Sequence, residues 1–184
     1  MARIIVPLAE GFEEIEAVTV IDLLRRAGVD VVTAGVDGQE VTGSHGITVR
    51  CDSLAGSCDP AGADGIVLPG GMPGTTHLIH SAAVGHLVRE MFAAGKLTAA
   101  ICAAPKVLAS TGLLDGRSAT SFPGAIDGAR YPEVRLIEQP VVTDGTVVTS
   151  RGPGTAMDFA LHLIELLLDR DRRNAVEAKL MRPV

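Results

Sequence analysis

Cys102 is the residue best suited to covalent chemistry, because it stands where an apolar run ends and a helical pattern begins. The run is Leu97–Ile101, and the helical pattern covers residues 103 to about 110. A nucleophile on so sharp a turn needs small neighbours, and alanines occupy positions 100, 103 and 104. Free N–H groups at the start of a helix also lower the pKa of a thiol. The spacing therefore predicts a reactive thiol, and the alternative is a small buried cysteine that only packs.

Glu16 is the second candidate, because its carboxyl group falls on the apolar face of the first predicted helix. It shares that face with Val20, Leu23 and Ala27, at offsets of four, seven and eleven residues. A carboxyl group on such a face is protonated or specifically hydrogen-bonded, since burying the bare charge is costly. Protonated Glu16 could therefore donate a hydrogen bond to a thiolate. The alternative is an acidic cluster, Glu13 included, that only favours the start of the helix.

Two glycine-rich segments follow other apolar runs. Gly70 and Gly71 come directly after Gly65–Leu68, so their N–H groups are available to an oxyanion or a carboxylate. A glycine pair at this place also fits a simple tight turn. Residues 150–155 (Ser-Arg-Gly-Pro-Gly-Thr) lead into a helix that Thr155 is expected to cap. This segment lacks the lysine of a phosphate-binding loop, which favours a structural role.

The remaining cysteines and most histidines favour packing or surface roles. Two cysteines are seven residues apart, without the spacing of a strong metal site, and three histidines have no acidic or cysteine ligand beside them. We therefore expect neither a metal ion nor another cofactor. His45, in a predicted hairpin turn, could reach the same site as Cys102. The residues set aside are Cys51, Cys58, His77, His80 and His86.

These candidates must be positioned by short apolar runs that alternate with helical patterns. The predicted strands are Ile4–Leu8, Val29–Ala34, Gly65–Leu68, Leu97–Ile101, Ser118–Ser121 and Val134–Ile137, with hairpins pairing Val41–Thr42 with Ile47–Arg50 and Val141–Thr143 with Thr146–Thr149. The predicted helices are Glu13–Ala27, Ser81–Ala94, Ala103–Ser110, Thr155–Leu168 and Asp171–Leu180. This order predicts an α/β fold, a doubly wound and mainly parallel sheet with helices on both faces, in one domain over residues 1–184. Ligands in such folds bind at the carboxyl ends of the strands, so the candidates are expected to share one rim.

Composition narrows the classes of function. Of 184 residues, 47% are hydrophobic and only 3% aromatic, and the net charge is −6. An acidic chain with few aromatic platforms is not expected to bind nucleic acid. No stretch reaches the ~20 apolar residues of a membrane span, and the N-terminus lacks a signal-peptide pattern. Three cysteines without a disulfide framework are typical of the reducing cytoplasm, where we expect the protein.

Taken together, five segments resemble the ThiJ/PfpI superfamily, and within it the branch of the Parkinsonism-associated deglycase. They occur in the family's order and cover almost the whole chain. The cysteine turn and the Ser-Arg-Gly-Pro-Gly-Thr segment are specific in combination. The five segments are Gly11–Glu16, Arg25–Gly28, Leu68–Gly71, Ala99–Pro105 and Thr149–Thr155.

The resemblance implies a flavodoxin-like fold, a homodimer and a cofactor-independent site. It makes Cys102 the oxidisable nucleophile and Glu16 its protonated hydrogen-bond partner, with the N–H groups of Gly71 and Ala103 as an oxyanion site. Arg26 would help to set a dimer interface near that site. His45 falls roughly where a family arginine lines it.

Two functions are implied. The first is conversion of methylglyoxal or glyoxal to the hydroxy acid, with removal of early glycation adducts from proteins. The second is non-enzymatic sensing of oxidative stress, or chaperone action, through oxidation of the same cysteine. Some members place a histidine near the nucleophile, but Phe122 stands there in this chain. A cysteine–histidine pair is therefore not expected, which leaves proton transfer to Glu16 or water and disfavours an amidase or protease.

Overall fold

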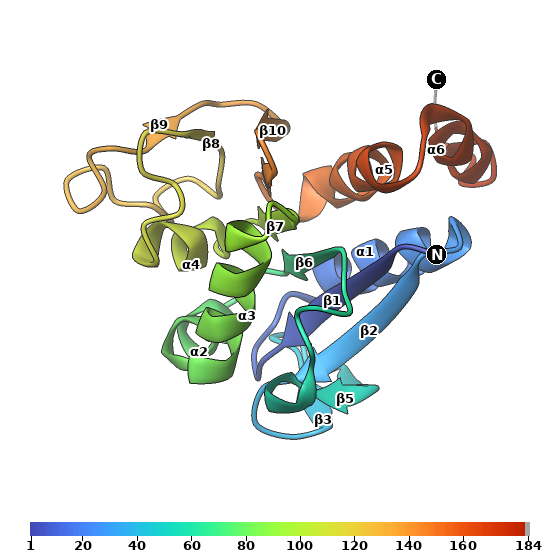
Figure 1. Ribbon diagram of the computed structural model, residues 1–184, viewed down its shortest axis with the longest axis horizontal. Coiled ribbons are helices and arrows are strands. Elements are labelled where there is room, and N and C mark those ends of the chain that lie inside the picture. Colours follow the sequence, from blue (N-terminus) through green and yellow to red (C-terminus); the bar gives the residue numbers. More distant parts are fainter. Residues whose placement is uncertain (183–184) are drawn as a thin grey trace.

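A computed structural model, which describes residues 1–182, is built around one seven-stranded sheet (Figure 1). All of its neighbouring strands run parallel except β10, which is antiparallel to β11. In sheet order the strands are β10 (Val141–Asp144), β11 (Val147–Ser150), β7 (Leu97–Ile101), β6 (Gly65–Leu68), β1 (Arg3–Leu8), β2 (Asp30–Gly35) and β5 (Ser53–Leu54).

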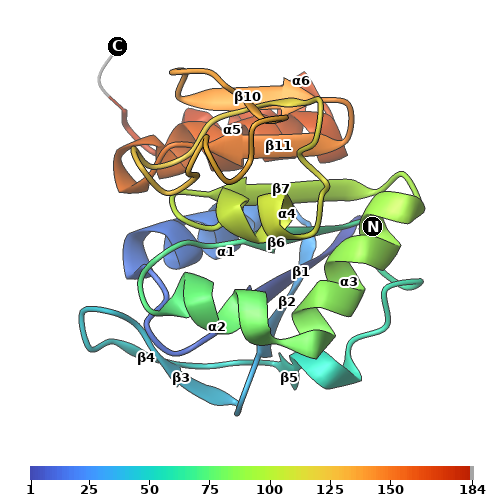
Figure 2. The ribbon, with the colours of Figure 1, turned by 90° about the vertical axis from the view of Figure 1, so that its left-hand side faces the viewer.

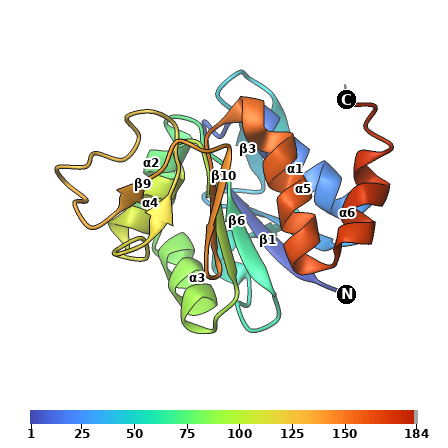
Figure 3. The same ribbon diagram turned by 90° about the horizontal axis from the view of Figure 1, so that it is seen from above.

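Helices cover both faces of this sheet, as Figure 3 shows from above. One face is covered by α1 (Glu14–Arg26), α5 (Ala156–Leu167) and α6 (Arg170–Glu177). The other face is covered by α2 (Gly74–His80), α3 (Ala82–Ala93) and α4 (Pro105–Ser110). Because both faces are covered, the central strands are mostly apolar, and each face has its own cluster of buried hydrophobic side chains. The expected doubly wound α/β fold is confirmed.

Small elements lie outside the sheet. An antiparallel pair, β3 (Glu40–Thr42) and β4 (Thr48–Arg50), projects near the start of α1, and Figure 2 shows it beside β5. A second pair, β8 (Ser118–Ala119) and β9 (Arg135–Leu136), lies near β10. Two short 3-10 turns occupy Ala55–Ser57 and Pro153–Thr155.

Both edges of the sheet are short or engaged. At the β10 edge, the Asp144 carboxylate pairs with the Arg117 guanidinium at 3.1 Å and accepts the Ser118 N–H at 2.9 Å. Pro140, directly before β10, has no N–H to donate to another strand. The opposite edge, β5, is only two residues long.

The predicted strands and helices are found to within three residues of their expected ends. Helix α2 was not predicted, because its seven residues are rich in threonine and histidine and carry no capping side chain. It forms in the folded protein because Thr75 and Leu78 are buried against the rest of the chain. Strand β5 was also missed, since two residues give no periodic pattern. None of the helices within residues 1–182 is long and apolar enough to cross a membrane.

Candidate active site

Cys102 occupies a strained turn between β7 and α4. Its backbone has φ = +65°, a conformation that costs a residue with a side chain about 1–3 kcal/mol. The turn is held from both sides, because the Cys102 N–H donates to the Ser150 carbonyl at 2.9 Å and its carbonyl accepts the Phe122 N–H at 2.8 Å. The side chain is partly exposed. This arrangement turns the thiol out of the strand at the carboxyl end of the sheet, as the sequence predicts.

Glu16 brings a carboxyl group to this turn from the first part of α1. Its side chain is completely buried, on the same helix face as Val20 and Leu23. Oε2 accepts the Gly70 N–H at 2.8 Å, whereas Oε1 has no hydrogen-bond partner among the described residues. Burial raises the pKa of this carboxyl from 4.5 to about 7, against hydrogen bonds from Cys102 and Gly70 that lower it. The expected protonated partner is thus available up to about neutral pH.

The glycine pair closes the site because neither position has room for a side chain. A Cβ on Gly70 would lie 2.7 Å from the Cys102 Cβ and 2.8 Å from the Glu16 Oε2. Gly71 has φ = +92°, and a Cβ there would lie 2.3 Å from the Glu13 N. The Gly70 N–H is engaged by Glu16, so this residue positions the carboxyl group rather than offering a free N–H.

Two backbone N–H groups act on the sulfur. Those of Ala103 and Gly71 lower the pKa of the Cys102 thiol by favouring its charged form. Donors at this place can also stabilise negative charge that develops on an atom bound to the sulfur. The structure thus brings Cys102, Glu16, Gly71 and Ala103 together.

The pKa of the thiol nevertheless differs from the sequence prediction. Burial, and after it the negative charge of the Glu16 carboxylate, raise the pKa of Cys102 from 9.0 to about 12. The expected lowering by N–H groups is present but outweighed. The prediction of a low thiol pKa is therefore wrong, because the pattern at the helix start contains neither burial nor a neighbouring anion.

The two groups form one proton-sharing pair. With Glu16 ionised, the thiol keeps its proton, and the carboxylate is the base that can accept it as the sulfur reacts. With Glu16 protonated, the repulsion on a thiolate disappears, and the carboxyl O–H can donate to the sulfur. The pair can therefore supply a nucleophile, a base and an acid in turn.

Three further candidates lie around this pair or away from it. The Phe122 ring is half-exposed, and both this ring and the Cys102 Sγ lie near Gly152. Arg26 lies ten residues after Glu16, about 15 Å along the helix axis, and its Nε pairs with Asp22 at 2.6 Å. It is not part of the same chain's Cys102 site, and its role in a dimer interface stays a prediction.

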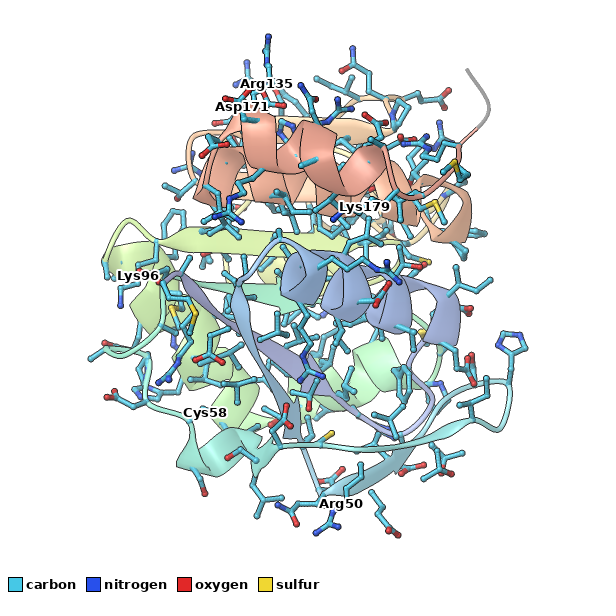
Figure 4. All side chains as sticks on the ribbon, turned by 90° about the vertical axis from the view of Figure 1, so that its right-hand side faces the viewer. Arg50, Cys58, Lys96, Arg135, Asp171 and Lys179 are labelled. Carbon is cyan, nitrogen blue, oxygen red and sulfur yellow. The ribbon has the colours of Figure 1, made fainter. Side chains whose placement is uncertain are left out.

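Arg26 instead lines a hollow of about 200 Å³ between the end of α1 and α6. Arg172 and Lys179 complete its cationic lining, and Lys179 is labelled in Figure 4.

His45 contacts other acidic groups than Glu16. Its Nδ1 lies 3.0 Å from the Glu14 Oε2 and 3.8 Å from the Glu13 Oε2, and its backbone N–H donates to Glu14 at 2.7 Å. Glu14 also accepts the Ile47 N–H at 3.4 Å, and its pKa falls from 4.5 to about 2 despite burial, because of these hydrogen bonds. Glu14, which the sequence analysis did not single out, thus ties the β3–β4 turn to the start of α1.

The Ser-Arg-Gly-Pro-Gly-Thr segment has the structural role that the sequence favoured. The Thr155 Oγ1 accepts the Gly152 N–H at 3.1 Å and lies 2.7 Å from the Ser150 Oγ. These bonds fix the turn against which Cys102 packs. Arg151, by contrast, points into hollows beside the site, which its sequence context did not indicate.

Comparison with known proteins identifies relatives that share the sequence pattern and the fold of this chain. The model of the DJ-1/PfpI family matches residues 2–166. Protein DJ-1 homolog A of Arabidopsis thaliana is 39% identical over 180 residues, 97% of this chain but only 46% of the relative, so the chain spans about half the length of this relative. A deglycase of Pyrococcus abyssi is 34% identical over 165 residues, 90% of this chain and 99% of the relative. The structure of oxidized DJ-1 from Toxoplasma gondii superposes with a TM-score of 0.92 at 39% identity, with both chains fully covered.

Proposed function

The chain belongs to the DJ-1/PfpI family, and from that premise we propose that it is a glutathione-independent glyoxalase that converts methylglyoxal or glyoxal to the hydroxy acid. The observation that carries the proposal is the pairing of Cys102 with a buried carboxyl group under two N–H donors. The name of the Pyrococcus relative, a deglycase, supports activity on related aldehyde adducts. We extend the proposal to early glycation adducts of proteins.

The first step joins the sulfur to the aldehyde carbon of methylglyoxal. As the C–S bond forms, the thiol proton passes to the Glu16 carboxylate, and the electron pair of the C=O bond moves to oxygen. The N–H groups of Gly71 and Ala103 stabilise that oxyanion. Protonation of the oxygen gives a hemithioacetal.

The second step moves hydrogen between adjacent carbons. Glu16 removes the proton from the carbon bound to sulfur, which gives an enediol, and returns it to the neighbouring carbonyl carbon. The hydroxyl proton on the sulfur-bearing carbon passes to the neighbouring oxygen, so that carbon becomes the C=O of a lactoyl thioester on Cys102. Water then attacks the thioester, and the thiol leaves with a proton. One carbon is oxidised while its neighbour is reduced, so the net reaction adds only water.

The test is turnover of methylglyoxal by the purified protein without glutathione, followed as lactate formation. Cys102→Ala should lose at least a hundredfold in kcat/KM, since the covalent step is removed. Cys58→Ala is the matched control, because Cys58, labelled in Figure 4, lies in the loop after β5 at one edge of the sheet, whereas Cys102 follows β7. Equal turnover by the parent and Cys102→Ala would refute the mechanism.

The second candidate is a redox sensor or chaperone in which peroxide oxidises Cys102 to a sulfinic acid. Each of two peroxide molecules delivers one oxygen to the sulfur and leaves as water. The buried Glu16 carboxyl beside the sulfur supports this reading, since its protonated form would hydrogen-bond the sulfinate. So does the oxidized form of the Toxoplasma relative. A two-oxygen adduct confined to Cys102, without aldehyde turnover, would favour the sensor, and a thiol indifferent to peroxide would count against it.

We further propose that the protein works as a homodimer in the cytoplasm. Exposed apolar side chains at Ile15 and Val18 on α1, and at Ile47 in the β3–β4 turn, support such an interface. The three cysteines are free, which suits a reducing compartment. Light scattering after gel filtration measures the dimer, and a monomer at micromolar concentration would contradict it.

A further inference from the structure

We propose that Phe122 and Arg151 form a second subsite next to Cys102, which binds the distal part of the substrate, and that this part is an aryl group carrying a carboxylate. The proposal rests on the proposed function for its substrate class. It assigns this chain a preference for anionic arylglyoxals over methylglyoxal.

The subsite consists of two adjoining hollows of about 210 and 240 Å³. Phe122, Pro123 and Arg151 line both of them. Leu136 and Ile137 complete the first, and Gly152 belongs to the second. Methylglyoxal has a single methyl group beyond its reacting carbonyls, so it would leave both hollows unfilled.

The wall of the first hollow is apolar and exposed. Phe122 is 51% exposed, and Leu136 and Ile137, which lie in and directly after β9, are 48% and 38% exposed. Gathering three exposed apolar side chains in one hollow is costly unless a ligand covers them. A planar aryl group suits this wall, because it can stack on the Phe122 ring.

Arg151 supplies the charge. Its side chain is 32% exposed, and its guanidinium lies 3.8 Å from the Glu138 carboxylate, which is itself 91% exposed. An ion pair of this length and exposure contributes little to stability. A ligand carboxylate could replace Glu138 with a shorter, bidentate contact to the guanidinium. The guanidinium therefore favours an anion within these hollows.

The hollows connect to the nucleophile at Gly152. The Cβ position of Gly152 lies 3.5 Å from the Phe122 ring and 3.9 Å from the Cys102 Sγ, so the ring and the sulfur both border this residue. The Phe122 N–H also donates to the Cys102 carbonyl at 2.8 Å, which fixes the ring relative to the thiol. A substrate whose aldehyde carbon meets the sulfur can thus extend past Gly152 over the ring.

Turnover provides the first test. We compare kcat/KM for 4-carboxyphenylglyoxal, phenylglyoxal and methylglyoxal in the parent, Phe122→Ala and Arg151→Gln. Phe122→Ala should lower the ratio of phenylglyoxal to methylglyoxal about fivefold, the equivalent of one aromatic stacking contact. Arg151→Gln should lower the ratio of the carboxylated to the plain arylglyoxal about threefold, as expected for a partly exposed charge pair. Leu166→Ala removes a side chain of similar exposure, 48%, at the other end of the sheet, and should change neither ratio.

Alkylation of Cys102 provides a test that does not need turnover. The thiol displaces bromide from bromoacetone, phenacyl bromide or 4-carboxyphenacyl bromide, and the thiol proton leaves to Glu16 or water. Rates are followed by mass spectrometry of the Cys102 peptide and divided by the rates with N-acetylcysteine. The parent should prefer the carboxylated aryl reagent, with the same losses in the two variants.

The two tests separate the subsite from the proposed function. Preferential alkylation without turnover of any aldehyde supports the subsite and refutes the glyoxalase. Turnover with ratios unaffected by Phe122→Ala and Arg151→Gln, together with unselective alkylation, refutes the subsite and leaves the glyoxalase standing.

Discussion

Replacing Glu16 by glutamine should make the protein more stable at neutral pH and leave it unchanged in acid. The carboxyl is completely buried, and its pKa is about 7 in the folded chain against 4.5 for the free group. Below pH 4.5 it is protonated in both the folded and the unfolded chain, so it does not affect the balance. Between pH 4.5 and about pH 7, the unfolded chain releases the proton whereas the folded chain keeps it. The free energy of unfolding of the parent therefore falls as the pH rises through this range.

The size of this loss follows from the two pKa values. Their difference corresponds to about 3 kcal/mol above pH 7, since each pKa unit equals about 1.4 kcal/mol. Glutamine has no proton to lose, and its carbonyl oxygen can still accept the Gly70 N–H. The free energy of unfolding of Glu16→Gln minus that of the parent should therefore rise by about 3 kcal/mol between pH 4 and pH 8.

Urea denaturation at matched protein concentrations measures this difference at half-unit steps of pH. Other titrating groups are the same in both proteins and cancel in the subtraction. Measurements stay below pH 8.5 so that ionisation of Cys102, with a pKa of about 12, does not enter. A difference independent of pH, or one that falls as the pH rises, would refute the reasoning.

Three further predictions test the geometry of the site. Gly70→Ala would place a Cβ 2.7 Å from the Cys102 Cβ, so it should lower kcat/KM at least tenfold and destabilise by about 1–3 kcal/mol. Gly128→Ala, in open space, should alter neither quantity, and equal effects of the two would contradict the close packing. Cys102→Gly should be about 1 kcal/mol more stable to denaturant than Cys102→Ala, because glycine tolerates φ = +65°; equal stabilities would mean an unstrained turn. Glu16→Gln should also shift the pH profile of Cys102 alkylation by iodoacetamide to lower pH, since the neighbouring anion is gone, and an unmoved profile would show that the carboxylate does not act on the thiol.

The strands of the sheet could be predicted because each of them has a recognisable local sequence pattern. Runs such as Leu97–Ile101 are apolar except for Thr98, as is typical of strands covered on both faces, and the structure has the strand within the same bounds. Helix α2 could not be predicted, because its formation depends on burial of Thr75 and Leu78 against distant segments. Local propensity alone does not contain that information.

The candidate site divides in the same way. The turn at Cys102 and the buried position of Glu16 followed from neighbouring residues and from helix periodicity. The direction of the pKa shift of the thiol did not follow from the sequence, because it depends on burial and on a carboxylate from another element. The sequence placed the segment of Arg151 at the rim, but the neighbours of this side chain, Phe122 and the β9 region, depend on the fold.

The short and engaged edges of the sheet have a consequence for behaviour at high concentration. A sheet grows by pairing a free edge with another strand, and growth from folded molecules is a common route to aggregates. Within residues 1–182, one edge consists of the two residues of β5 and the outer part of β2, where Arg25 and Asp52 bond the Val31 carbonyl and the Thr33 N–H. The other edge places a proline and the Arg117–Asp144 pair where a new strand would dock. The native protein is therefore expected to stay dispersed at high concentration without seeding fibrils.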